Sequence, residues 1–254
     1  MKKKNIFAIF AQAGFALAAA LLISIGLASC SKDKNKMEED VVYMTTEKEK
    51  DNDFSLWIDE NDGPIFVEGA ELLGSLKGGG WLQILYKVSA KKLIVRGEFT
   101  RLHCGDCSLS YLDVSKKKDL KELYCEDNGL PNLDVSKNKQ LEILHCYDNT
   151  DLSNLDVSKN PQLRELDCTG CGLSALDLRN NPKLTYLECH STKITGENLK
   201  LPDVKGIGGG VLRFKASRDD NQKLSVEQVG KIKNLGWKVF FYKDGSWQEY
   251  NGED

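Results

Sequence analysis

Apolar residues recur along the middle of the chain with a period of 21 or 22 residues. A run of Leu-Asp-Val-Ser begins at Leu112, Leu133 and Leu155, and a related Leu-Asp-Leu-Arg run begins at Leu176. A second series, Leu-x-Cys, begins at Leu102, Leu123, Leu144, Leu166 and Leu187. The one extra residue falls in a loop at 150–151, so the register is kept. Five repeats at one period predict stacked, structurally equivalent units.

Aligned, the unit reads L-x-x-L-x-C-x-x-N-x-L-x-x-L-D-V-S-x-N-x-x, and it is seen whole over residues 120–140. This pattern resembles the leucine-rich repeat, in particular a short bacterial class of 21 residues, over about residues 99–200. The resemblance implies a β-rich (α/β-type) solenoid of about five short repeats. It also implies a protein that binds a partner and catalyses nothing.

Each repeat is expected to contribute a short strand whose alternate Leu and Cys side chains face a core that the repeats share. The position that follows each strand holds Cys107, Asn128, Asn149, Cys171 and Thr192. In this fold such a side chain points inward and binds backbone groups at the bend. The recurring aspartates are expected to accept backbone N–H bonds in tight turns; they are Asp113, Asp134, Asp156 and Asp177.

Both ends of the repeat array look built to cover it. Strand-like runs at 41–45, 54–58, 64–67, 81–88 and 92–97 predict a β-rich N-terminal cap over residues 41–98. Residues 201–254 predict an α/β cap: a strand at 211–216, a helix that begins at Ser225 and ends near Asn234, and strands at 237–242 and 247–250. Gln228 is placed to complete a capping box with Ser225. The solenoid itself is predicted over 99–200.

The N-terminus indicates export. Three lysines precede an apolar run from Ile6 to about Ala28, as in a secretory signal over residues 1–29. The run ends in Leu27-Ala28-Ser29-Cys30, which resembles a bacterial lipobox and implies that the peptide is cut before Cys30, which then carries a lipid. The alternative is an uncleaved anchor, since roughly 20 apolar residues can span a bilayer. Residues 30–40 continue as a charged tether. We expect an exported protein, lipid-anchored at the outer membrane or cell surface.

The eight cysteines include two Cys-x-x-Cys pairs, which begin at Cys104 and Cys168. Such pairs can indicate a zinc site or a redox dithiol. Here both pairs occupy inward positions three repeats apart, about 14 Å at roughly 4.8 Å per strand, too far for one zinc ion. The sequence therefore favours a buried column of free thiols, with no metal and no cofactor.

The positions around each Leu-x-Cys strand that face outward form a predicted concave binding face. They are rich in acidic residues and include all three histidines and three tyrosines. The candidate ligand-binding residues are His103, Asp106, Tyr124, Glu126, Asp127, His145, Tyr147, Asp148, Asp167, Tyr186, Glu188 and His190. A metal site around His145 and Asp127 or Asp148 is disfavoured because nothing fixes a ligand count.

The charge pattern favours a partner with a basic surface, because complementary charge steers encounter. The favoured hypothesis is a protein partner, from a host or a neighbouring cell, bound at the cell envelope for interaction or adhesion. The second hypothesis is a glycan-binding or envelope-structural lipoprotein in which Tyr124, Tyr147 and Tyr186 stack on sugars. Net charge is −3, so no basic field favours nucleic acid. No catalytic residues are predicted, because the sequence has no G-x-S-x-G, no H-E-x-x-H and no phosphate-binding glycine loop.

Overall fold

The computed structural model describes residues 40–59, 64–215, 224–243 and 245–251. The predicted signal peptide, Cys30 and almost all of the tether lie outside these residues. Within the described part of the chain, no helix is both long and apolar enough to cross a membrane.

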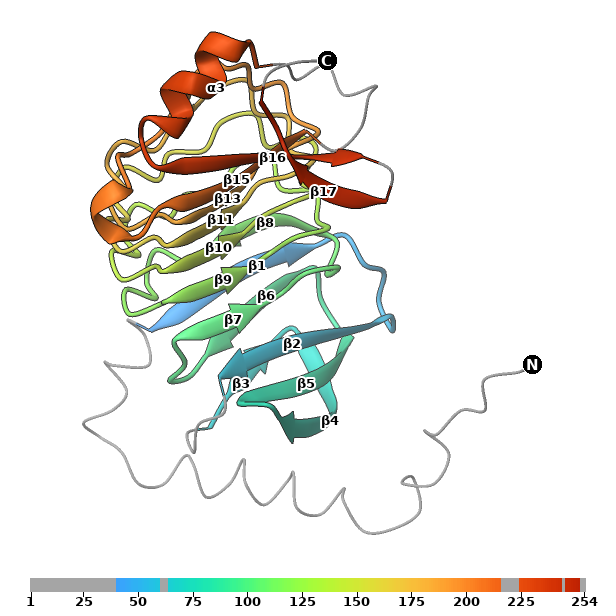
Figure 1. Ribbon diagram of the computed structural model, residues 1–254. Coiled ribbons are helices and arrows are strands. Elements are labelled where there is room, and N and C mark those ends of the chain that lie inside the picture. Colours follow the sequence, from blue (N-terminus) through green and yellow to red (C-terminus); the bar gives the residue numbers. More distant parts are fainter. Residues whose placement is uncertain (1–39, 60–63, 216–223, 244, 252–254) are drawn as a thin grey trace. The chain divides into compact units, whose positions relative to one another are not determined.

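The repeats form a parallel sheet, with one three-residue strand per unit (Figure 1). The strands are β7 (Arg101–His103), β9 (Glu122–Tyr124), β10 (Ile143–His145), β11 (Glu165–Asp167) and β13 (Tyr186–Glu188). Their central leucines pair with one another in one register, and the 22-residue unit does not disturb it. The predicted solenoid of five short repeats is confirmed.

The interior is built from columns that run through all five repeats. The Leu and Cys members of every Leu-x-Cys strand are fully buried. Because one unit could not cover its own apolar side chains, this shared core holds the stack together. At roughly 25 cal/mol per Å² of apolar surface removed from water, burial of each leucine contributes about 2 kcal/mol.

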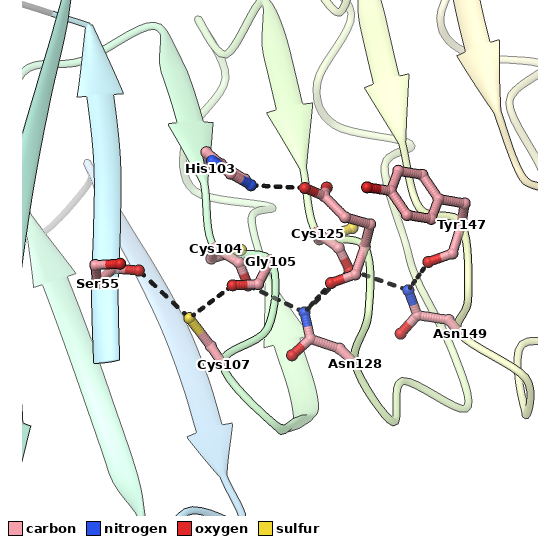
Figure 2. Close-up of polar contacts among 10 residues, drawn as sticks. Ser55, His103, Cys104, Gly105, Cys107, Cys125, Asn128, Tyr147 and Asn149 are labelled. Carbon is pink, nitrogen blue, oxygen red and sulfur yellow. Dashed lines mark hydrogen bonds and ion pairs between the residues drawn. The ribbon is translucent and has the colours of Figure 1, made fainter. Parts of the chain in front are cut away.

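The position after each strand binds backbone groups of the preceding turn, as predicted (Figure 2). Asn128 Nδ2 donates to Cys104 O at 3.0 Å, and Asn149 Nδ2 donates to Cys125 O at 3.0 Å. A thiol takes this role in two repeats, where Cys107 Sγ donates to Ser55 O and Cys171 Sγ to Cys146 O. These bonds satisfy carbonyls that the bend would otherwise leave without donors.

A second asparagine column lies on the far side of the core. Asn138, Asn160 and Asn181 are fully buried, and each Nδ2 donates to two carbonyls of the preceding repeat. The first repeat has Lys117 at this position. Its side chain is 0% exposed, and Nζ donates to Asp40 Oδ1 at 2.7 Å and to Gly97 O at 3.2 Å. The column therefore ends on a buried lysine that binds the N-terminal segment.

The recurring aspartates make the predicted turn contacts. In the first three Leu-Asp-Val-Ser runs, the aspartate Oδ1 accepts the N–H of the serine two residues later at 2.8 Å. In the fourth, Asp177 accepts from Arg179 N at 3.1 Å. On the same side of the core, β12 (Leu176–Asp177) pairs with β14 (Leu199–Lys200).

The N-terminal strands extend both sides of the repeats. On one side β2 (Asp53–Asp59) pairs with β7, and β5 (Trp81–Val88) and β4 (Ala70–Gly78) follow outward from it. On the other side β1 (Val41–Thr46) lies between β8 (Leu109–Asp113) and β6 (Lys92–Arg96), and β3 (Phe66–Glu68) closes that sheet. The five strands that the sequence predicts for the N-terminal cap are present near their expected bounds. The sixth strand, β4, was not predicted from the sequence.

At the C-terminal end β15 (Gly210–Lys215) and β16 (Trp237–Lys243) continue the parallel sheet, and β17 (Ser246–Glu249) folds back on β16. A 3₁₀ turn (η2, Lys205–Ile207) precedes β15. Helix α3 (Val226–Lys233) begins at Ser225 with both bonds of the predicted capping box to Gln228, and it ends at Asn234. The result is one sheet of 11 strands from β4 to β17.

Candidate functional site

One row of side chains crosses the whole 11-stranded sheet, which we call the central row. Its members are directly opposed from strand to strand, and they point away from the buried leucines that alternate with them. From β4 to β17 the row is Leu76, Gln83, Trp57, His103, Tyr124, His145, Asp167, Glu188, Arg213, Phe240 and Glu249. The face that carries this row, here called the outer face, therefore runs without interruption from the N-terminal strands to the C-terminal hairpin.

The N-terminal half of the outer face is aromatic. Ring centroids lie 6.3 Å apart for Trp57–His103, 5.8 Å for His103–Tyr124 and 4.9 Å for Tyr124–His145. The rings of Trp81 and Tyr124 form a T-shaped pair with centroids 5.7 Å apart. We call these five residues the aromatic cluster. Large aromatic side chains that keep part of their surface exposed are the residues that most often anchor protein interfaces.

The C-terminal half is built around an arginine. Arg213 NH1 donates to Tyr186 OH at 2.6 Å and lies 3.2 Å from Glu188 Oε2. The same guanidinium is 4.9 Å from the ring centroid of Trp247. We call Tyr186, Glu188 and Trp247 the arginine cage. Burial raises the pKa of Glu188, but bonds from His190 and Tyr186 and the charge of Arg213 outweigh it and lower the pKa to about 2.

Two histidines of the outer face pair with a glutamate of the next repeat. His103 Nε2 lies 2.6 Å from Glu126 Oε1, and His145 Nε2 lies 2.8 Å from Glu165 Oε1. The Glu126 carboxylate lies over Gly105, where a Cβ would come within 2.7 Å of it. Burial raises the pKa of Glu126, but the hydrogen bond and charge of His103 bring it below its usual value. One oxygen of each carboxylate therefore already has a partner within the protein.

Further acidic residues stand at the turn that follows each of the first three repeat strands. Asp106, Asp127 and Asp148 are exposed and have left-handed backbones, with φ of 52°, 51° and 55°. We call them the acidic column. No hydrogen bond or ion pair of their carboxylates is found within the described part of the chain. Partial burial and repulsion by Asp148, Glu126 and Asp106 raise the pKa of Asp127.

The structure places all 12 candidate residues on the outer face or at its edge. Five lie in the central row: His103, Tyr124, His145, Asp167 and Glu188. Tyr186 lies beside the row on β13, and Glu126, Tyr147 and His190 follow the inward cysteines. The remaining three form the acidic column. Burial raises the pKa of Asp167, whose Oδ1 accepts Thr169 N at 3.0 Å.

Sequence reasoning missed four residues of this face, namely Trp57, Trp81, Arg213 and Trp247. A signal was available for Trp57, because Phe54, Leu56 and Ile58 alternate as inward residues and leave it on the opposite side. The antiparallel pairing that brings β2 beside β7 has no comparable signal in the sequence.

The interior cysteines take no part in this face. All seven described cysteines are free and buried. Burial raises the pKa of Cys104, Cys125 and Cys168 well above the usual thiol value, which disfavours the reactive thiolate. Among the described residues, no group of three or more His, Cys, Asp or Glu side chains is arranged to hold a metal ion.

The parallel one-strand repeats, the buried Leu and Cys columns and the asparagine columns define a leucine-rich-repeat β-solenoid. No protein-family model matches the chain, and no curated protein matches it. Two solved structures from Listeria monocytogenes are similar to part of it. One is the functional domain of InlJ, which includes a cysteine ladder: identity is 30%, the TM-score is 0.43, and the match covers 55% of this chain and 30% of that one. The other is the internalin InlF of strain 4b F2365, with 14% identity, a TM-score of 0.33 and 55% of each chain covered. The chain thus spans less than a third of the InlJ structure.

Proposed function

We propose that the protein is a non-enzymatic binding module for protein–protein interaction or adhesion at the bacterial cell envelope. In this proposal it is exported, lipid-anchored through Cys30 at the outer membrane or cell surface, and it binds through the outer face. The partner is a protein with a basic surface, from a host or a neighbouring cell. The observation that carries the proposal is the juxtaposition of exposed, uncompensated carboxylates in the acidic column with the aromatic cluster.

The charge pattern sets the chemistry of the partner. Glu126, Glu165 and Glu188 already have partners in His103, His145 and Arg213, so they are less available to a ligand. The carboxylates of the acidic column have no such partner among the described residues, and a row of acidic side chains attracts a basic surface and raises the rate of encounter. Aromatic side chains beside it supply the apolar contact that gives affinity.

Charge reversal tests the binding face. Full-length protein with Asp106, Asp127 and Asp148 of the acidic column changed to lysine is compared with wild type for capture of purified basic surface proteins from host or neighbouring cells. A matched control reverses three exposed carboxylates that lie outside the strands of the 11-stranded sheet: Asp151, Glu197 and Glu227. Loss of capture in the first variant alone supports the proposal. Equal capture by both variants would move the site off the outer face, and retention on sugars in a glycan array would favour the glycan-binding alternative.

The anchor and location are tested separately. Metabolic labelling with a clickable fatty acid should mark the wild type, whereas Cys30→Ala should remain unlabelled. Protease treatment of intact cells, followed with an antibody to the C-terminal end, should digest a surface-displayed protein. Protection until lysis would assign the protein to the periplasm, and its partners would then be sought in the envelope.

A further inference from the structure

The outer face already holds arginine side chains in two aromatic settings. Arg101 lies over Trp81, with its guanidinium carbon 4.2 Å from the ring centroid, and it donates to Gly80 O. Arg213 occupies the arginine cage between two aromatic rings and a carboxylate. A guanidinium fits such a setting because it is planar, stacks on rings and donates to oxygens at its edge. These two arginines lie at opposite ends of the repeat sheet.

Tyr147, between these two ends, is a further aromatic residue near carboxylates, and no cation lies over its ring among the described residues. Its phenol stands among the carboxylates of Glu126, Asp127, Asp167 and Asp148. The pKa of Tyr147 is raised to about 12. Burial is the largest cause, and the charges of these four groups follow in the order given. Tyr124 and Tyr186 donate their hydroxyl protons to Glu122 and Glu188, whereas the Tyr147 hydroxyl has no hydrogen bond within the described part of the chain.

A buried oxygen beside Tyr147 also lacks a donor. Glu126 is only 9% exposed; its Oε1 is bound to His103, while Oε2 is buried with no partner among the described residues. Glu126 precedes Tyr147 at the equivalent position of the neighbouring repeat, where Asp127 N donates to Tyr147 O at 3.0 Å. In Figure 2 the Tyr147 hydroxyl points across the strands towards His103, the residue that binds Glu126. Because Oε2 has almost no exposed surface, a ligand that donates an N–H group to it must first displace the side chain that covers it.

We propose that Tyr147, Glu126, Asp127 and Asp148 form a subsite that binds the guanidinium of an arginine side chain of the partner. The proposal rests on the proposed function of the outer face and specifies its chemistry. The guanidinium stacks on the Tyr147 ring and donates to the hydroxyl, as Arg213 does to Tyr186. Carboxylates of adjacent repeats follow at about 4.8 Å, the strand spacing, so the two edges of one guanidinium fork can reach two of them.

The test uses full-length protein and synthetic peptides of equal charge. Binding of hexaarginine and hexalysine is measured by calorimetry at about 150 mM salt. We expect hexaarginine to bind more tightly, and Tyr147→Ala to weaken it about tenfold, an effect in the range of a partly desolvated cation–π contact. The matched control is Tyr111→Ala, since Tyr111 is 51% exposed on β8 beside Asp113 and outside the outer face. Tyr111→Ala should leave the affinity unchanged.

Two results would overturn the subsite. One is equal loss of hexaarginine binding in the Tyr147 and Tyr111 variants, and the other is equal affinity of wild type for the two peptides. Thermal unfolding of each variant checks that the fold is kept. Failure of the subsite is distinguishable from failure of the proposed function: if protein partners still need the acidic column but are insensitive to Tyr147→Ala, the binding face stands and the guanidinium site does not.

Discussion

Replacement of Lys117 by asparagine would give the first repeat the residue that the later repeats carry at this position. We nevertheless expect the Lys117→Asn variant to be less stable than wild type. The asparagine column can donate to the preceding repeat because that repeat offers two carbonyls at 2.7–2.9 Å. Before the first repeat, the acceptors are Gly97 O and the Asp40 carboxylate, which only the longer lysine reaches.

The expected loss follows from the contacts of Lys117. Its ammonium is fully buried, 2.7 Å from Asp40, whose side chain is 21% exposed, and 4.5 Å above the Phe99 ring. Breaking a buried ion pair costs about 3–5 kcal/mol, and the partial exposure of Asp40 favours the lower end of that range. We therefore expect the free energy of unfolding to fall by about 3 kcal/mol. For a protein of this size, that lowers Tm by roughly 6–12 °C.

Urea denaturation followed by circular dichroism measures this change. Lys118→Asn is the matched control, since Lys118 is the exposed neighbour of Lys117 in the same turn. A double-mutant cycle with Asp40→Asn should give a coupling energy of about 1–3 kcal/mol. If Lys117→Asn unfolds within about 0.5 kcal/mol of wild type, the buried lysine is not what joins the N-terminal segment to the first repeat, and the reasoning is refuted.

Three further predictions concern charge and thiols. Asp127→Asn should raise stability by a few tenths of a kcal/mol, because it removes repulsion at an exposed site and asparagine tolerates the left-handed backbone; a lower melting temperature would contradict this. The pKa of Glu188 is about 2 in the folded protein and near 4.5 otherwise, so its stabilising contribution is complete above pH 4.5 and is lost as pH falls towards 2. Unfolding curves at pH 2–5 should show this loss, and Glu188→Gln should flatten it. Native protein should leave the thiols of Cys104, Cys125 and Cys168 unreactive towards a disulfide reagent until urea unfolds it; rapid labelling of the folded protein would show that the core opens.

The repeat register could be predicted because a 21-residue period fixes which side chains face inward. The Leu and Cys columns, the turn aspartates and the Ser225–Gln228 capping box all depend on contacts within one repeat or between identical neighbours. Such contacts are encoded locally, so their spacing in the chain determines them.

The features that could not be predicted depend on pairing between dissimilar segments. Strand β4 lacks alternation, and Leu76 is 70% exposed at the edge of the sheet, so no apolar pattern marks it. The place of Trp57 beside His103 follows from antiparallel pairing of β2 with β7 across 46 residues. Nothing in the local sequence distinguishes Lys117 from its neighbours Lys116 and Lys118, because its partner Asp40 is 77 residues away in the chain.

The central row has a consequence for how the protein can change over generations. Each repeat adds one strand and one row member, and the extra residue of the 22-residue unit is absorbed between Asn149 and Leu152, outside the row. Duplication or deletion of one whole unit would therefore lengthen or shorten the outer face by a single strand spacing while every leucine stayed inside. Unequal recombination between repeats that share this motif could thus adjust the reach of the protein in discrete steps and leave both ends of the sheet unchanged.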